Sequence, residues 1–303
     1  MDVTASMVKE LRELTGAGMM DCKKALAESG GDIEAAVDVL RTKGLADLAK
    51  KAGRATNEGI IGSHAADRGT AVLVEVNCET DFVARNADFK AFVSEIARQI
   101  VDTAPADVAA LLAQPYAARP EITIEQLLGE IVGRLGENMG IARFERYAAS
   151  GDDRTVAVYV HGVGNIGVLV EVAAGTAQAA ASDAVATFAK DVAMQVAAAA
   201  PVAVRREEVP AQIVEHERAI FRAQAAESGK PPAIQDKIAE GRLDKFYKEA
   251  CLLEQDFVKN SDITVKQYAQ ETGAATGTTV EVVRFARLVL GETNPEPKPA
   301  SCC

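Results

Sequence analysis

The chain has 303 residues, of which 48% are hydrophobic, enough for more than one core. Acidic residues (44) outnumber basic ones (33), and the formal net charge of −11 argues against binding along a nucleic-acid backbone. The five cysteines have neither a disulfide framework nor zinc spacing, and the first residues lack the features of a signal peptide. No apolar run is long enough to span a membrane, so we expect a cytoplasmic protein whose partners are other proteins.

The N-terminal part of the chain predicts a bundle of short helices. Leu11 and Leu14 recur at helical spacing in the first helix, and glycines separate it from a second helix over residues 19–28. A third helix follows, and Gly44 is expected to end it. Three helices in so short a stretch indicate a compact bundle at residues 1–54.

Residues 55–150 predict an α+β unit. Two strands are joined by a tight turn, and the returning strand covers residues 71–76. The apolar stripe over residues 89–100 predicts a helix that packs against this sheet. Another helix is expected over residues 124–135, and it leads into a strand over residues 141–147.

A second α+β unit is predicted from residues 151–206 and 254–292. Its strands are expected over residues 155–160, 168–172 and 280–290, with a helix over residues 181–199. Between its two parts, residues 207–253 predict two amphipathic helices in an antiparallel hairpin. Residues 293–303 contain closely spaced prolines and are expected to form a disordered tail.

The second unit repeats part of the first unit at a fixed distance. Residues 72–76, Val-Leu-Val-Glu-Val, return as residues 168–172, a shift of 96 residues. The same shift aligns Thr80 with Thr176, Phe92 with Phe188, and Gln99 with Gln195. Asp81-Phe82-Val83 does not repeat, because Ala177-Gln178-Ala179 stands in its place. An acid beside a large ring, on the loop after a buried strand, suits insertion into a partner.

Gly162, Gly164 and Gly167 match the G-x-G-x-x-G pattern of dinucleotide-binding proteins. That function needs a helix after the last glycine, where the phosphate would bind, whereas residues 168–172 predict a strand. We therefore interpret these glycines as the turn of a hairpin. The histidines lie far apart in the sequence and no nucleophile motif is present, so the sequence predicts no metal site, no cofactor and no covalent catalysis.

Met19 and Met20 are adjacent on the second predicted helix. Neighbouring helical residues point about 100° apart, so the two side chains cannot both face one core. At least one of them is therefore expected at the surface, beside Lys9 and Arg12 of the first helix. This combination predicts a small docking patch on the bundle.

Two segments resemble the signatures of the bacterial elongation factor Ts family. Residues 15–26 (TGAGMMDCKKAL) are similar to the first and residues 76–86 (VNCETDFVARN) to the second, and the resemblance extends over residues 3–292. It implies an α+β fold with an N-terminal three-helix bundle like a ubiquitin-associated (UBA) domain. A duplicated core with small antiparallel sheets and an inserted helical hairpin would follow. The implied function is guanine nucleotide exchange on elongation factor Tu during translation elongation, without enzymatic chemistry.

The resemblance also implies contacts with Tu by matching position. Thr80, Asp81, Phe82 and Val83, together with Leu135 and Gly136, would disturb the magnesium and phosphate site of Tu. Lys9, Arg12, Met19 and Met20 would dock on its GTPase domain. His161, Met194, Phe257 and Val258 would face another domain of Tu. The chain would bind GDP-bound and nucleotide-free Tu, with no direct contact to nucleic acid or membrane.

The sequence departs from the family pattern at two places. Gln195 stands where relatives commonly carry His, and Pro295, Pro297 and Pro299 prevent a C-terminal helix that contacts Tu in many relatives. The hairpin leaves two alternatives open: self-association, in a homodimer or a 2:2 complex, or bracing of the core. Rival functions are a Rossmann-type enzyme, a helical adaptor for ubiquitin-like partners and an RNA-binding protein. The missing helix after Gly167 disfavours the enzyme, the duplicated core disfavours the adaptor, and the negative charge disfavours RNA binding.

Overall fold

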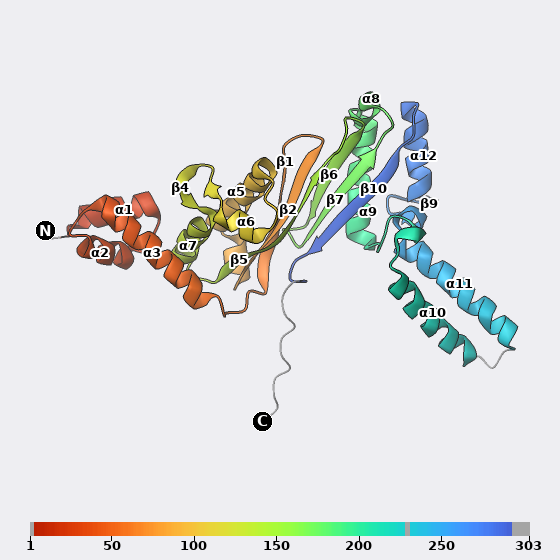
Figure 1. The fold of residues 1–303 in the computed structure, drawn as a ribbon, viewed down its shortest axis with the longest axis horizontal. Helices are drawn as coiled ribbons and strands as arrows, with labels where there is room; N and C mark the ends of the chain where they lie inside the picture. The colour runs from red at the N-terminus through yellow and green to blue at the C-terminus, as the bar shows by residue number, and fades with distance from the viewer. Residues whose placement is uncertain (1–2, 228–230, 293–303) are drawn as a thin grey trace.

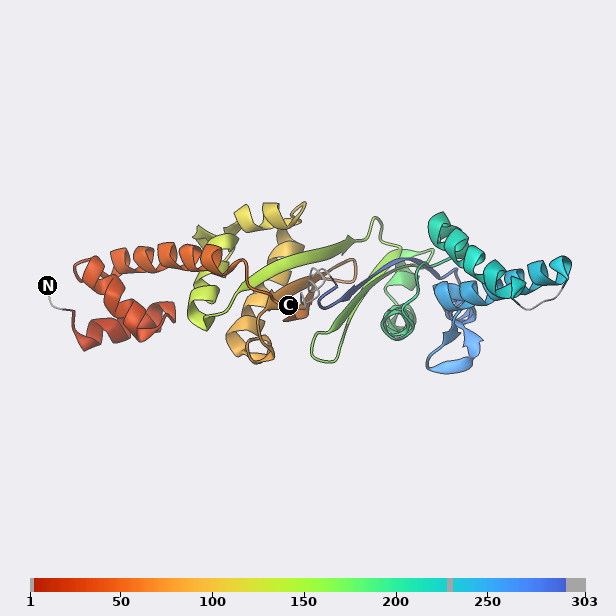
Figure 2. The same cartoon turned by 90° about the horizontal axis from the view of Figure 1, so that it is seen from below.

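Helices and sheets follow one another along the long axis of the molecule (Figure 1 and Figure 2). The computed structural model describes residues 3–227 and 231–292. The N-terminal helices lie at one end of the axis, and a hairpin of α10 (Ala211–Ala226) and α11 (Pro232–Ala250) lies at the other. The main sheets lie between these ends. The fold is α+β, which confirms the fold class that the sequence predicts.

The N-terminal bundle contains α1 (Ala5–Thr15), α2 (Met19–Glu28) and α3 (Ile33–Lys51). Thr4 caps α1 by accepting a hydrogen bond from the Met7 amide, and Gly16 ends it in the left-handed conformation at φ 67°. Leu11 is fully buried among the helices, but Leu14 is 66% exposed. Helical spacing therefore predicted the helix but not which residues of the stripe are covered.

Gly44 does not end α3, contrary to the sequence prediction. It lies inside the helix where α3 packs against α7 (Ile124–Leu135), and a Cβ on Gly44 would stand 2.8 Å from the Gly129 carbonyl oxygen. A Cβ on Gly129 would in turn stand 3.0 Å from the Gly44 carbonyl carbon. The two glycines let the helix backbones touch, so Gly44 serves the packing of the bundle on the core.

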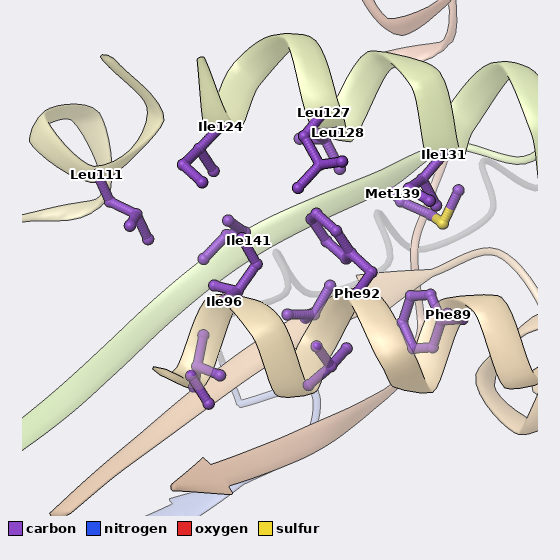
Figure 3. Packing of buried hydrophobic residues seen from close by; sticks show 14 of the residues in the cluster. Phe89, Phe92, Ile96, Leu111, Ile124, Leu127, Leu128, Ile131, Met139 and Ile141 are labelled. Carbon is purple, nitrogen blue, oxygen red and sulfur yellow. The ribbon is translucent and has the colours of Figure 1, made fainter. Parts of the chain in front are cut away.

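The first core half is an antiparallel sheet, in the order β1-β2-β5, with helices on one face. Besides α7, its elements are β1 (Glu58–Ala65), β2 (Thr70–Cys78), α4 (Asp81–Arg85), α5 (Ala87–Thr103), α6 (Val108–Ala113), β3 (Pro115–Tyr116), β4 (Arg119–Thr123) and β5 (Met139–Ala148). Alternate valines of β2, such as Val74, share a large apolar cluster with α5 and α7. Figure 3 shows Phe92 of α5 pointing toward Leu128 of α7 within this cluster.

The second core half is built in the same way, with strand order β10-β7-β6. Its elements are β6 (Arg154–His161), β7 (Ile166–Ala173), α8 (Ala177–Ala180), α9 (Asp183–Ala199), β8 (Asp256–Phe257), β9 (Asn260–Thr264), α12 (Val265–Thr276) and β10 (Glu281–Val289). Helix α12 was not predicted from the sequence, because its apolar stripe is weak. Its start is nevertheless marked by a capping box, in which Thr264 and Gln267 satisfy each other's backbone amides.

The duplication covers more of the fold than the 96-residue shift indicates. Helices α5 and α9 keep that shift, and the residues that end them, Ala104 and Ala200, have φ angles of 46° and 45°. Beyond the hairpin the shift becomes 141 residues, since Val265 begins α12 as Ile124 begins α7. The additional residues hold η1 (Arg206–Glu208), α10, α11 and η2 (Leu252–Glu254), which stand where the first half has α6. The hairpin is thus an insertion into the second copy.

The two sheets pack against each other through a separate apolar cluster. Leu73 of β2 and Leu169 of β7 point into it, on the opposite face from the helices. A Cβ on Gly167 would stand 2.6 Å from a methyl carbon of Ile61, and the Gly164 carbonyl accepts a hydrogen bond from the Ile61 amide at 2.8 Å. The G-x-G-x-x-G glycines therefore belong to the β6–β7 hairpin and a sheet contact, which confirms their interpretation as a turn.

The helical hairpin is joined to the core at its base. Arg206 of η1 forms hydrogen bonds with the Glu254 carboxylate and, at 2.7 Å, with Asp244 of α11. Its guanidinium also lies 4.8 Å from the ring centroid of Tyr247. The hydrogen bonds to Glu254 raise the pKa of Arg206 above its ordinary value. The hairpin therefore has a fixed base, and its other end projects away from the sheets (Figure 1).

Candidate functional site

Asp81 and Phe82 lie on the first turn of α4, and not on a loop as the sequence analysis expected. Thr80 caps this short helix, because its hydroxyl oxygen accepts a hydrogen bond from the Val83 amide at 3.4 Å. Val83 and Ala84 are buried in the first apolar cluster and anchor the helix to the core. Phe82, by contrast, is 82% exposed. A five-residue helix thus presents a large ring to the solvent from an anchored base.

The acid beside this ring is only weakly engaged within the chain. Asp81 forms an ion pair with Arg85 one helical turn later, with an N–O distance of 3.1 Å. Pairs of this kind on exposed helices contribute about 0.3–0.5 kcal/mol. The Asp81 carboxylate is therefore available to a partner at little cost in stability.

Cys78 ends β2 directly before the Glu79-Thr80 segment. Burial raises the pKa of its thiol to about 12, so the thiol is protonated at neutral pH. It donates a hydrogen bond to the Thr80 carbonyl at 3.2 Å. Cys78 therefore supports the backbone before α4 and lacks the thiolate character of a nucleophile.

The turn between α7 and β5 meets the base of α4. Gly136 ends α7 at φ 82°, and Leu135 packs against the first apolar cluster. The next residue, Glu137, accepts hydrogen bonds from the Thr80 amide at 3.0 Å and from its hydroxyl at 2.6 Å. The predicted residues Leu135 and Gly136 thus lie in the turn that holds Thr80. Glu137 itself was not predicted as a site residue, although the second copy carries Thr278 at this position and so does not share the acid.

The residues predicted for the N-terminal dock, Lys9, Arg12, Met19 and Met20, all lie on the surface of the bundle. The two methionines are 58% and 63% exposed, because α2 buries its other face. Leu14 adds a third exposed apolar side chain to this bundle, which the sequence analysis had placed on a helical stripe without assigning it a contact. Exposed apolar side chains among basic residues suit a protein contact.

The residues predicted for the second core half differ in exposure. His161 is exposed at the end of β6, where its Nδ1 lies 2.9 Å from the Tyr159 hydroxyl, and Met194 is half-buried on α9. Val258 is 52% exposed, but Phe257 is buried and stacks on Tyr268 with a centroid distance of 4.6 Å. The Phe257 ring is therefore covered by its own chain, and His161 and Val258 are the accessible candidates.

Gln195, at the position where the resemblance implies a histidine, has a structural role here. It is buried, and its side-chain oxygen accepts a hydrogen bond from the Val258 amide at 2.8 Å. Gln99 accepts an equivalent bond from the Ala117 amide at 3.0 Å in the first half. Gln195 therefore keeps a repeated contact that holds the β8–β9 turn, and its side chain faces the interior.

Within residues 3–227 and 231–292, His, Cys, Asp and Glu side chains form no group of three or more that is arranged to hold a metal ion. Among the helices of these same ranges, none is long and apolar enough to cross a bilayer. The predicted tail, with Pro295, Pro297, Pro299, Cys302 and Cys303, lies outside the described residues.

Comparisons with known proteins decide the family. Residues 79–292 match the family model described as Elongation factor TS. The chain belongs to the elongation factor Ts family. The protein named elongation factor Ts in Trichlorobacter lovleyi is 48% identical over 293 residues, which cover 96% of this chain and 94% of that protein. Those of Clostridioides difficile and Clostridium novyi are 48% and 47% identical, with 96% of this chain and 93% of each relative covered.

Membership of this family makes the chain an elongation factor of protein synthesis. The match begins at Glu79, directly before the Thr80 cap, and extends through the rest of the first core half and the whole second half to residue 292. It therefore includes α4, the turn at Glu137 and the inserted hairpin. The similar relatives extend the likeness over the N-terminal bundle, since they cover 96% of the chain.

Proposed function

We propose that this chain is the guanine nucleotide exchange factor of elongation factor Tu. It binds Tu·GDP, promotes the release of GDP and holds nucleotide-free Tu until GTP binds. The observation that carries the proposal is Phe82, which is 82% exposed on a helix whose next two residues are buried. Family membership supplies the partner, and no covalent bond changes in the reaction.

Asp81 and Phe82 act as a wedge beside the magnesium and phosphate site of Tu. The ring displaces elements of Tu that hold GDP, and the Asp81 carboxylate brings negative charge toward the phosphates, where it would also offer an oxygen ligand to a magnesium ion. Binding of the wedge and binding of GDP are therefore antagonistic. By thermodynamic linkage, GDP weakens the binding of this chain to Tu by the same factor by which the chain weakens the binding of GDP.

The wedge alone does not provide enough free energy for fast exchange. An acceleration of four decades requires about 5.5 kcal/mol. Burial of one Phe side chain provides roughly 1.5–3 kcal/mol. The remainder must come from other contacts, and the elongated arrangement in Figure 1 spreads the bundle and the two sheets over a length that suits a broad interface.

Two further groups of residues provide those contacts. The N-terminal dock (Lys9, Arg12, Met19 and Met20) binds the GTPase domain of Tu, where its methionines are the apolar part. In the second core half, His161, Met194 and Val258 face another domain of Tu. Contacts from the bundle and from the second core half hold Tu in place while the wedge acts.

The test is the release of fluorescent GDP from Tu. Phe82→Ala is expected to slow stimulated release by about 10- to 150-fold, the equivalent of roughly 1.5–3 kcal/mol of lost burial. Gln178→Ala is the matched control, since Gln178 is exposed at the same position of the second copy and is expected to be neutral. Equal rates of GDP release for wild type and Phe82→Ala would contradict the proposed role of Phe82 as a wedge. A wild-type chain without any effect on GDP release would remove the exchange function.

The proposal also includes the location and assembly of the complex. Tu acts in translation, so we infer a cytoplasmic location for this chain. Self-association through the hairpin, in a homodimer or a 2:2 complex with Tu, stays a prediction. Sedimentation of the free chain and of its complex with Tu measures both masses and decides between self-association and bracing of the core.

A further inference from the structure

The base of α4 is held by acids that the exchange proposal does not use. The Glu137 carboxylate accepts two hydrogen bonds from Thr80, at 3.0 and 2.6 Å. Glu79, the residue before Thr80, accepts a hydrogen bond from the Asn138 amide at 2.6 Å. Each of the two turns thus supplies a carboxylate to the backbone of the other. We name Glu79, Thr80, Glu137 and Asn138 the carboxylate latch.

The latch also holds the segment that arrives from the N-terminal bundle. The Arg54 guanidinium lies 3.3 Å from the Glu79 carboxylate, and the Arg54 carbonyl accepts a hydrogen bond from Asn138 Nδ2 at 2.9 Å. Just before, Lys51 at the end of α3 donates to the Val132 carbonyl of α7 at 3.4 Å. The hydrogen bond from the Asn138 amide lowers the pKa of Glu79, so its carboxylate is charged at neutral pH. One turn therefore ties the bundle segment to the start of α4.

The second copy builds the same helix cap without a latch. The hydroxyl oxygen of Thr176 accepts a hydrogen bond from the Ala179 amide at 3.2 Å and so caps α8. Its own amide donates to the Ala174 carbonyl at 2.7 Å, where Thr80 donates to an acid. The cap of a short helix at this place in the fold therefore does not require Glu137.

The residues at the latch positions of the second copy cannot form one. Gly175 stands at the position of Glu79, and Thr278 stands at that of Glu137. A Cβ on Gly175 would lie 2.4 Å from the Thr278 hydroxyl oxygen, so the two turns approach too closely there for an acid. The latch thus accompanies Phe82 in one copy and is replaced where the ring is replaced.

We propose that the carboxylate latch positions Phe82. It fixes α4 relative to the segment from the bundle, so that a partner bound at the N-terminal dock meets the ring at a set place. The inference rests on the proposed exchange function, and it makes Glu137 and Asn138 positioning residues that act through α4. A ring fixed before contact raises the rate of the step it drives more than it raises the affinity of the whole interface.

The first experiment needs no partner. Amide hydrogen exchange is measured over residues 79–86 of the free chain, in wild type and in Glu137→Gln, which keeps the shape of the side chain but only one acceptor oxygen. Loss of a hydrogen bond to a charged group is expected to speed amide exchange in α4 about tenfold. Thr278→Ala, at the same place in the second copy, is the control and should leave α4 unchanged. Unchanged amide exchange in Glu137→Gln would overturn the latch.

The second experiment measures stimulated GDP release against the concentration of this chain. Glu137→Gln is expected to lower the maximal rate about tenfold and to change the half-saturating concentration less than about twofold. In a Phe82→Ala background, Glu137→Gln should have no further effect, because it acts through the ring. Equal effects in both backgrounds would overturn the positioning role. Asn138→Ala combined with Arg54→Ala removes both contacts with the bundle segment, and a wild-type maximal rate in that double variant would overturn the link to the bundle.

The two experiments separate failure of this inference from failure of the proposed function. A wild-type chain that does not stimulate GDP release overturns the exchange function, and with it the purpose of the latch. In that case faster amide exchange in Glu137→Gln would still establish that the latch holds α4. If wild type stimulates GDP release and Glu137→Gln matches wild type in both amide exchange and GDP release, the latch is overturned but the exchange function is not.

Discussion

The two core halves share a scaffold and differ in what they display. Thr80 and Thr176 cap equivalent helices, and both sheets cover equivalent long helices. The first half displays Phe82 on a helix whose cap, Thr80, is hydrogen-bonded to Glu137, whereas the second displays Gln178 and carries the α10–α11 insertion in place of α6. A duplicated fold keeps in both copies what packing requires. The unshared groups are therefore where the functions of the halves separated.

The largest expected effect concerns the buried acids Glu75 and Glu171, which are equivalent but differently paired. Glu75 pairs with Arg143 at 2.8 Å, while Glu171 pairs with Arg154 at 2.9 Å and Arg284 at 2.6 Å. Arg143→Met should lower the free energy of unfolding by about 3–5 kcal/mol, because it leaves a buried carboxylate without its ion-pair partner. Arg154→Met leaves Glu171 one arginine and should cost about 1 kcal/mol. Urea unfolding measures both, and equal losses would contradict the difference between the halves.

An exchange of the unshared residues tests whether the display site matters as much as the residues. Asp81-Phe82 is replaced by Ala-Gln, and Ala177-Gln178 by Asp-Phe, in one chain. The rate of stimulated GDP release should fall about 10- to 150-fold, the equivalent of the roughly 1.5–3 kcal/mol that burial of one Phe side chain provides. The reason is that a ring on α8 has neither the latch nor the bundle segment beside it. The rate of fluorescent GDP release measures this. Activity close to wild type would show that the two display sites are interchangeable.

The contact between the bundle and the core is also restricted to the first half, since Gln270 replaces Gly129 on α12 and is exposed. Gly44→Ala should lower the free energy of unfolding by about 1–3 kcal/mol, because its Cβ overpacks the α3–α7 contact. Gly133→Ala is the control: its Cβ would lie 4.0 Å from Gly44 Cα, an ordinary contact. Alanine favours the helix there by up to about 1 kcal/mol. Thermal unfolding should show a lower Tm for Gly44→Ala and an unchanged or higher Tm for Gly133→Ala. Equal Tm shifts in the two variants would argue against close packing of α3 on α7.

The last expected effect is a loss of stability at alkaline pH that involves both halves. Burial raises the pKa of Tyr147 and of Tyr268 to about 12, from an ordinary value of 10. The fold favours the neutral phenol, so this stabilisation is complete below pH 10 and is lost as the pH rises toward about 12. The urea midpoint should fall over that interval, and less steeply in Tyr147→Phe or Tyr268→Phe. A urea midpoint that stays constant between pH 10 and about 12 would contradict the raised pKa values of these two tyrosines.

Local sequence patterns predicted many elements of the fold. The predicted bounds of α2 and α7 agree with the structure, because glycines flank α2 on both sides and Gly136 ends α7. Gly44 was misjudged because a glycine at a helix end and a glycine at a helix crossing look alike in the sequence. Helix α12 was missed because it buries few large side chains.

The candidate site was predicted in part. Asp81 and Phe82 stood out because the second copy lacks them, and Met19 and Met20 because neighbours on a helix cannot share one core. The role of Glu137 could not be predicted in the same way. It meets Thr80 across 57 positions of the chain, and no local pattern links two residues so far apart.

The sequence by itself determined the order of the elements, the duplication and the unshared Asp-Phe pair, because caps, periodicity and repeats are properties of neighbouring residues. Only the tertiary structure decided that Phe82 is exposed, that Gly44 is a packing residue and that Glu137 holds Thr80. Exposure and contact depend on which distant segments meet on folding. That is settled by the burial of apolar surface over the whole chain and by the pairing of buried polar groups.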